Sequence, residues 1–126
     1  MLPGRRTHTT LPTSDLERSR RFYEGVLGFE PADVSPGGVT YESADGTTFL
    51  VFPSTGRAAG THTQMGFTVP EIEGEVRELK ERGVTFESYD FAGFDPATSI
   101  ASAPGLRTAW FKDPDGNLIG LVQRMN

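Results

Sequence analysis

Apolar residues recur at two different spacings along the chain. Segments with these two spacings follow one another in the same order in each half of the sequence. Alternating runs predict strands, whereas apolar residues three or four apart predict helices. In the first half, a strand at about 6–11 precedes a helix that opens at Ser14, where Ser14 and Glu17 match a capping box, and ends at Gly28. Three strands complete this half, at about 29–34, 38–43 and 47–52.

The second half repeats this order. A strand at about 62–69 leads to a helix at 71–82, which Gly83 terminates. Three strands follow, at about 84–89, 107–112 and 118–123. The Gly, Pro and Ser content between residues 90 and 105 predicts a long loop there, and a loop of that length in a small domain is usually functional or mobile.

The repeat also appears in residue spacing. The helices recur at an offset of 56 residues (Leu16 onto Ile72) and the last strands at an offset of 70. The first offset carries His8 onto Gln64, and the second carries Leu50 onto Gly120. With 126 residues, the chain can bury one core shared by two half-size units. We therefore expect a single domain over 1–126, with modules at about 5–53 and 62–124 joined by a linker at 54–61.

Charge and composition narrow the class of protein. A net charge of −5 without a long basic run gives no electrostatic footprint for nucleic acid or an anionic membrane. The absence of Cys excludes disulfides and thiolate ligands. The N-terminus has no apolar signal region, and no apolar run is long enough to span a bilayer. We expect a cytoplasmic protein with neither nucleic acid nor membrane as a partner.

Alternation within the strands predicts two unequal sheet faces. The nearly all-apolar face is expected to lie under the helices, and it carries Phe49, Val51, Met65, Phe67, Val69, Ala109, Phe111, Ile119 and Leu121. The opposite face is mixed in polarity and includes His8, Tyr41, Leu50, Phe52, Gln64, Trp110 and Gly120. Small residues beside large aromatics on such a face are typical of a concave ligand pocket.

Several segments together resemble one known family. They are the stretch from His8 through Asp15-Leu16-Glu17-Arg18-Ser19, Phe22-Tyr23 and Leu27-Gly28-Phe29, and the ending Trp110-Phe111-Lys112-Asp113-Pro114-Asp115-Gly116-Asn117. They are similar to the vicinal oxygen chelate superfamily of glyoxalases, bleomycin-resistance proteins and extradiol dioxygenases, over essentially the whole chain. The resemblance implies an α+β fold of two βαβββ modules related by a pseudo-twofold, whose curved mixed sheets enclose a cavity. It also implies a homodimer.

The resemblance implies where a metal would bind. Metalloenzymes of the superfamily place His, Gln or Glu on the first and fourth strands of each module, which correspond here to His8, Leu50, Gln64 and Gly120. Leu50 and Gly120 offer no donor atom, and a catalytic divalent ion normally takes about three protein ligands. We therefore expect no metal cofactor. The alternative is a divalent metal in a rearranged site formed by His8, His62 and Gln64.

The candidate residues each have a structural and a functional interpretation. His8 is either a buried, hydrogen-bonded histidine or a pocket group that binds a ligand or transfers a proton. Gln64 is expected to donate hydrogen bonds from the pocket wall. The large aromatics either stack on a planar ligand or fill the sheet face, and this set comprises Tyr41, Phe52 and Trp110. The aromatics of the long loop either close over a ligand or anchor the loop, and they are Tyr89, Phe91 and Phe94.

Two classes of function stay open at this point. The first is a metal-independent small-molecule binding protein of the glyoxalase/bleomycin-resistance type, with an apolar or aromatic ligand in the sheet cavity. The second is a glyoxalase- or dioxygenase-like lyase or oxidoreductase, either metal-free with His8 as catalytic acid or base or with the rearranged metal site. The absence of a donor atom at Leu50 and Gly120 favours the first class.

Overall fold

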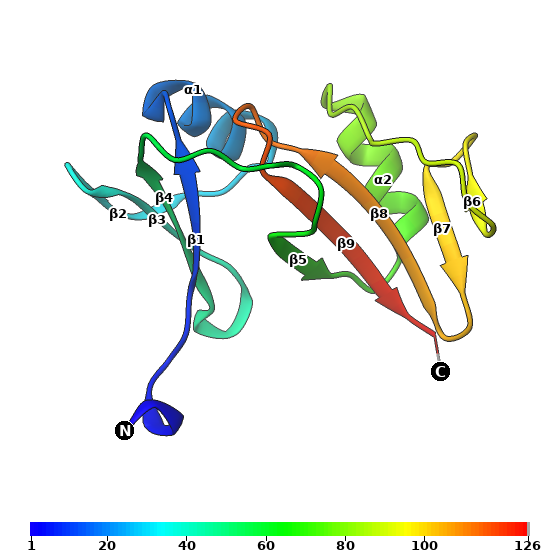
Figure 1. Cartoon of the computed structure of the whole chain (residues 1–126), viewed down its shortest axis with the longest axis horizontal. Helices are drawn as coiled ribbons and strands as arrows, with labels where there is room; N and C mark the ends of the chain where they lie inside the picture. Colours follow the sequence, from blue (N-terminus) through cyan, green and yellow to red (C-terminus); the bar gives the residue numbers. More distant parts are fainter. Residues whose placement is uncertain (126) are drawn as a thin grey trace. The chain divides into compact units, whose positions relative to one another are not determined.

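Two β-sheets, each with a helix on one face, form the computed structural model of the chain (Figure 1). The structure describes residues 1–125. The chain divides into two compact units, Met1–Arg57 and a second unit from Ala58 onward, and the division falls within the segment predicted as a linker. The predicted α+β class is confirmed. Over residues 1–125, no helix combines the length and the hydrophobicity that crossing a membrane would require.

The first unit contains a four-stranded mixed sheet. Its elements in chain order are the turn η1 (Leu2–Gly4), strand β1 (Thr9–Thr13), helix α1 (Leu16–Arg20), the π-helical continuation η2 (Arg21–Val26), β2 (Pro31–Ser35), β3 (Gly38–Glu42), the turn η3 (Ala44–Gly46) and β4 (Thr48–Pro53). The strand order is β1-β4-β3-β2, in which β1 runs parallel to β4 and the other neighbours are antiparallel. This is the predicted order of one strand, one helix and three strands.

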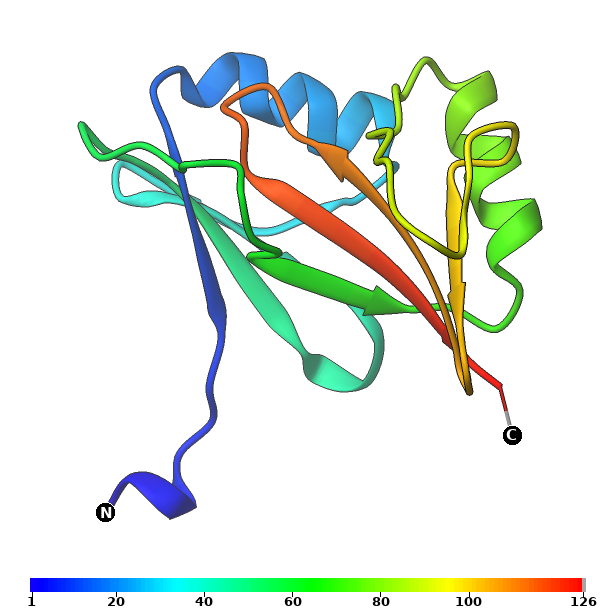
Figure 2. The same ribbon diagram turned by 45° about the vertical axis from the view of Figure 1, so that its right-hand side comes forward.

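The second unit contains a five-stranded mixed sheet. Its elements are β5 (Met65–Thr68), helix α2 (Ile72–Glu81), β6 (Phe94–Asp95), β7 (Ile100–Ala103), β8 (Leu106–Lys112) and β9 (Leu118–Arg124). The strand order is β5-β9-β8-β7-β6, with β5 parallel to β9. Figure 2, turned from the first view, shows α2 along one face of this sheet. The opposite face, here called the open face, is not covered by a helix of this unit.

The internal repeat extends to the pairing of individual residues. Thr10 lies opposite Leu50 in the parallel pair of the first sheet, and Gly66 lies opposite Gly120 in the parallel pair of the second. These pairs are related by the offsets of 56 and 70 residues found in the sequence. The register of β1 with β4 is thus reproduced, residue for residue, by β5 with β9.

Each of the two helices begins with a carboxylate as its N-cap. In the first helix this cap lies one residue later than the capping-box pattern predicts. Asp15 is the N-cap of α1, and its carboxylate accepts a hydrogen bond of 3.1 Å from the Arg18 amide. Glu71, 56 residues later, caps α2 by accepting a hydrogen bond of 2.7 Å from the Gly74 amide. The predicted cap at Ser14 is wrong because a carboxylate at position 15 can reach the third amide of the helix.

The predicted strand at 84–89 and the predicted loop at 90–105 are both corrected. Between 84 and 89 the structure has only an isolated bridge from Phe86 to Phe111. The next positions on the sheet edge are taken by β7 and the two-residue β6, which lie inside the predicted loop. Strands this short contain too few residues to show an alternating pattern. The Gly- and Ser-rich composition of the segment therefore predicted a loop.

Tyr41 lies on the helix-covered face of the first sheet, so its predicted place on the face of mixed polarity is wrong. The antiparallel pairing of β3 with β4 puts it opposite Phe49, and its side chain is fully buried. Its ring stacks on Tyr23 at 5.7 Å, and its hydroxyl donates to a Glu24 carboxylate oxygen at 2.8 Å. Burial, followed by the bond to Glu24, raises the pKa of Tyr41, and the Arg20 hydrogen bond lowers the pKa of Glu24.

The remaining apolar face was predicted correctly. Residues buried under the helices include Phe49, Val51, Met65, Val69, Ala109, Phe111, Ile119 and Leu121, and Phe67 is half-buried. Burial of such side chains contributes roughly 1.5–3 kcal/mol each relative to full exposure. Each unit therefore has its own apolar layer between sheet and helix.

A glycine at the start of the β6–β7 hairpin should be sensitive to substitution. Gly93 has φ 92°, and a Cβ there would lie 2.5 Å from the carbonyl oxygen of Ser102. Gly83 has φ 94°, but no atom within 4 Å of the same Cβ position. Gly83→Ala should lower the free energy of unfolding by about 1–2 kcal/mol through backbone strain alone. Gly93→Ala should lower it by about 1–3 kcal/mol more, because of the added steric clash.

Urea unfolding of both variants measures this difference. Equal losses of stability in the two variants would mean that the hairpin yields to the new side chain, and that Gly93 does not fix its position.

Candidate ligand-binding face

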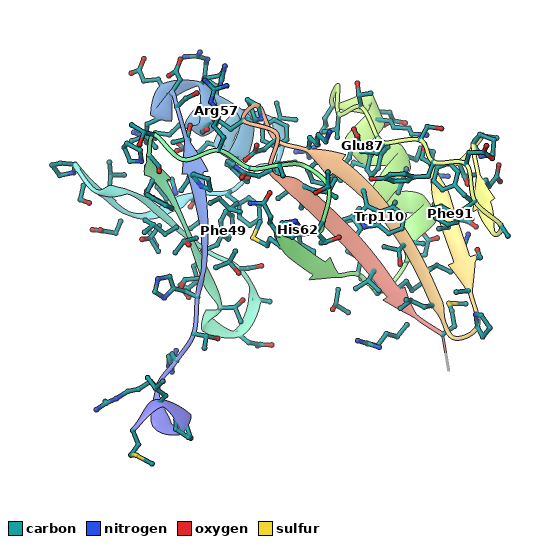
Figure 3. The ribbon with its side chains drawn as sticks, viewed as in Figure 1. Phe49, Arg57, His62, Glu87, Phe91 and Trp110 are labelled. Carbon is teal, nitrogen blue, oxygen red and sulfur yellow. The ribbon has the colours of Figure 1, made fainter. Side chains whose placement is uncertain are left out.

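Four aromatic side chains gather on the open face of the second sheet. This open-face aromatic cluster consists of Tyr89, Phe91, Phe94 and Trp110. Trp110 lies on β8 opposite Gly120, while Phe94 lies on β6 opposite Ala101, which in turn pairs with Thr108. Alternation along β8 therefore puts Phe94 and Trp110 on the same face. Figure 3 shows Trp110 and Phe91 coming from neighbouring segments of this unit.

The rings of the cluster meet mainly edge to face. The centroids of Tyr89 and Trp110 are 5.3 Å apart with ring planes at 86°, and those of Tyr89 and Phe94 are 5.9 Å apart at 87°. The ring centroid of Phe91 lies 5.7 Å from that of Phe94 and 6.5 Å from that of Trp110. Such contacts contribute about 0.5–1.5 kcal/mol each beyond area burial. Even so, Phe91 stays 48% exposed and Tyr89 37% exposed.

Gly120 lies beside the indole of Trp110. A Cβ at this position would be 3.6 Å from two indole atoms of Trp110, which is ordinary van der Waals contact, and a tighter 3.2 Å from the methyl group of Thr63. Thr63 also accepts a hydrogen bond of 3.1 Å from the indole N–H. The position that corresponds to a fourth-strand ligand thus carries no side chain and adjoins the edge of an indole ring.

Gln64 uses its side-chain amide to hold two strands together. Asn117 donates its own amide to Asp113 at 2.7 Å, so the Asn117 oxygen faces Gln64 and accepts its N–H at 2.9 Å. The Gln64 oxygen accepts the backbone amide of Leu118 at 3.2 Å. Both ends of this amide are therefore engaged in protein hydrogen bonds. The expected hydrogen-bonding role of Gln64 has its partners within the fold.

The candidate residues of the first unit are less enclosed. His8 immediately precedes β1 and is exposed. Its side chain makes no hydrogen bond within residues 1–125. The interpretation of His8 as a buried, hydrogen-bonded histidine is therefore wrong. Leu50 and Phe52 are half-buried on the face of β4 opposite the helix. A cavity enclosed by both modules stays a prediction.

The four superfamily ligand positions do not fit a catalytic divalent ion. Leu50 and Gly120 carry no donor, and the amide of Gln64 is already bonded, which leaves the imidazole of His8. His62 is exposed. In neither unit, over residues 1–125, do three His, Asp or Glu side chains come together in an arrangement that could hold a metal. The donor chemistry is poorer than the three protein ligands that such ions usually take.

Each unit has one open groove on its helix side. One, of about 460 Å³, runs between α2 and residues 97–100, and it is lined by Val76, Arg77, Lys80 and Ile100 among others. The other, of about 390 Å³, lies along α1 and η2 and is lined by Glu17, Arg20, Arg21, Glu24 and Gly25. Both have side chains of both charge signs, and neither includes a residue predicted to bind a ligand.

Sequence comparison identifies the family of this chain. The family model of the Glyoxalase/Bleomycin resistance protein/Dioxygenase superfamily matches residues 5–121. The chain belongs to this superfamily. The uncharacterized protein YurT of Bacillus subtilis (strain 168) is 29% identical over 132 residues, covering 92% of this chain and 96% of YurT.

Solved structures share the fold of this chain. TnmS3, an antibiotic binding protein from Streptomyces sp. CB03234, superposes with a TM-score of 0.72 at 24% identity, over 95% of this chain and 98% of TnmS3. The genomically encoded fosfomycin resistance protein FosX from Listeria monocytogenes gives a TM-score of 0.68 at 20% identity, over 97% of this chain and 94% of FosX. At these identities the likeness establishes the fold alone.

The sequence predicted a ligand-binding role for Trp110 and Gly120 but left the roles of Tyr89, Phe91 and Phe94 undecided. The spacing of Tyr89, Phe91 and Phe94 holds a usable signal, since three aromatics within six residues of a polar segment are unusual. Nothing in the local sequence shows that β6 folds this segment onto β8. Thr63 gave no signal, because its role depends on the indole of a strand far along the chain.

The different environments of Gln64 and His8 predict different effects on stability. Gln64→Leu removes the hydrogen bonds that Gln64 makes to the Asn117 oxygen and the Leu118 amide, so the free energy of unfolding should fall by about 1–3 kcal/mol. His8→Ala should change it by less than about 0.5 kcal/mol, as expected for an exposed side chain. Chemical unfolding of the two variants beside the wild type checks this. A Gln64→Leu variant as stable as the wild type would rule out the structural role.

Proposed function

We propose that this chain is a metal-independent small-molecule binding protein that holds an apolar or aromatic ligand against the open-face aromatic cluster. The observation that carries the proposal is the exposure of two rings of this cluster. Among residues 1–125, Tyr89 and Phe91 are the aromatic members of the small set of exposed large apolar side chains. Both belong to one cluster, on a sheet face without a helix.

The energetics favour a ligand over solvent at this surface. Removing apolar surface from water gains about 25 cal/mol per Å². Each additional ring contact adds about 0.5–1.5 kcal/mol. The hairpin that carries Phe94 and the hydrogen bond from Trp110 to Thr63 hold the rings in place before a ligand arrives, which lowers the entropic cost of binding.

Metal independence is supported by the donor chemistry of the four superfamily positions. Two of them lack a donor, and Gln64 is bonded within the fold. Two proteins of the same fold support a binding role by analogy, since TnmS3 is described as an antibiotic binding protein and FosX as a fosfomycin resistance protein. Neither description identifies the ligand of this chain.

Ligand binding should depend on the aromatic rings and not on a cation. For an aromatic hit from a small-molecule library, Trp110→Ala and Phe91→Ala should each weaken binding by at least about 0.5–1.5 kcal/mol, the contribution of one ring contact. Phe52→Ala tests whether the first unit contributes. Val34→Ala is a matched control, because Val34 is an exposed apolar residue of β2, 53% exposed.

Calorimetric titration with and without a chelator provides the measurement. We expect unchanged affinity in the chelator and in the Val34 variant. Binding that disappears in the chelator and returns with a divalent ion would instead favour the metalloenzyme alternative, and turnover of the hit that requires His8 would favour the metal-free enzyme.

We also propose that the protein forms a homodimer. In the strand order of the first unit, β1 and β2 are edge strands, and all five residues of β2 are exposed. Edge strands expose unpaired backbone groups, which proteins commonly cover by association. Light scattering at micromolar concentration should give the mass of two chains, twice 13.7 kDa. A monomer mass under these conditions would contradict the proposal.

A further inference from the structure

We propose that the open-face aromatic cluster selects planar aromatic ligands that carry a hydrogen-bond acceptor and no negative charge, and that the Tyr89 hydroxyl donates the hydrogen bond. This inference rests on the proposed function. It adds to that function the polar contact and the charge preference that would define the class of ligand.

Tyr89 has the one uncommitted polar group of the cluster. Phe91 and Phe94 have no polar atoms, and the indole N–H of Trp110 is bonded to Thr63. The hydroxyl of Tyr89 makes no hydrogen bond to any group in residues 1–125, although its ring contacts the three other rings. An acceptor on a ligand would replace water as the partner of this hydroxyl, which gives a modest net gain in binding.

The ring of Tyr89 is held in a defined orientation. Its plane is nearly perpendicular to the rings of both Trp110 and Phe94, at 86° and 87°. Two edge-to-face contacts restrict the ring, so the direction of its C–O bond is set before binding. Desolvation, followed by the nearby charge of Glu87, raises the pKa of Tyr89, so the hydroxyl remains protonated and acts as a donor.

The charge around the cluster disfavours anions. Glu87 and Asp90 flank Tyr89 in the segment 87–95, which contains no Lys or Arg. The third carboxylate of this segment, Asp95, lies opposite Ile100 on the other face and accepts the Ala97 amide at 2.9 Å. Lys112 offsets one of these charges through its 3.5 Å ion pair with Glu87. Figure 3 shows Glu87 in the same part of the unit as Phe91 and Trp110. A ligand carboxylate would therefore meet like charge at this surface.

The arrangement of the four rings favours a flat ligand. The edge-to-face arrangement leaves ring surfaces that a flat aromatic can contact by stacking or edge contact, whereas a bulky aliphatic group would make fewer such contacts. The inferred class is thus a planar, uncharged or cationic aromatic with an acceptor such as a ketone oxygen.

Three matched probes test the proposal. Fluorene is flat and has no acceptor, 9-fluorenone adds a ketone oxygen to the same rings, and 9-oxofluorene-2-carboxylate adds a negative charge. Equilibrium dialysis gives the affinity of each probe for wild type, Tyr89→Phe and Trp110→Ala. One hydrogen bond should make fluorenone bind about 2- to 12-fold more tightly than fluorene to the wild type.

Tyr89→Phe should remove this preference. The variant keeps the ring, and urea unfolding should match that of the wild type, because the lost hydroxyl has no partner in the fold. The carboxylate probe should bind more weakly than fluorenone. Trp110→Ala should weaken fluorene and fluorenone together.

The outcomes separate the two proposals. If Trp110→Ala weakens fluorene and fluorenone but Tyr89→Phe keeps the preference for fluorenone, the donor assignment is overturned and the aromatic binding function stands. Tighter binding of the carboxylate probe than of fluorenone overturns the charge preference. If the wild type binds none of the three probes, the inferred ligand class is overturned, whereas the proposed function is decided by the wider library.

Discussion

A buried chain of hydrogen bonds from Asp113 through Asn117 to Gln64 sets the register of the second sheet. Asn117 is fully buried and Asp113 is 5% exposed, so neither can exchange its partners for bulk water. The Asp113 carboxylate accepts both the backbone and side-chain amides of Asn117. A slip of one residue would break these bonds and turn each side chain of β9 to the other face. The position of Trp110 opposite Gly120 follows from this register.

The same constraint commits one superfamily position of the second unit to the fold, because the side-chain amide of Gln64 contributes to the register. At the superfamily position of the fourth strand, Gly120 carries no side chain, and the indole of Trp110 lies beside it at van der Waals distance. The open face therefore offers ring surface and one phenolic hydroxyl, and its recognition chemistry is that of stacking and neutral hydrogen bonding.

The sequence predicted the repeated parts of the fold and less of the irregular parts. The offset of 56 residues correctly aligned α1 with α2, which begin at Leu16 and Ile72, and the offset of 70 aligned β4 with β9, which begin at Thr48 and Leu118. Tyr41 was misplaced because its face depends on the register of an antiparallel partner, which hydrophobic alternation in one strand cannot fix. The hairpin of β6 and β7 was missed because its conformation depends on contacts with β8.

The location of the chain's single tryptophan has a practical consequence for spectroscopy. Trp110 is the whole source of indole emission, and it lies in ring contact with Tyr89, the other strong near-ultraviolet absorber of the cluster. Light absorbed by Tyr89 can transfer to the indole over such a short separation. The protein thus carries an intrinsic optical probe on the open face, whose colour and intensity respond to the polarity of whatever lies against the rings.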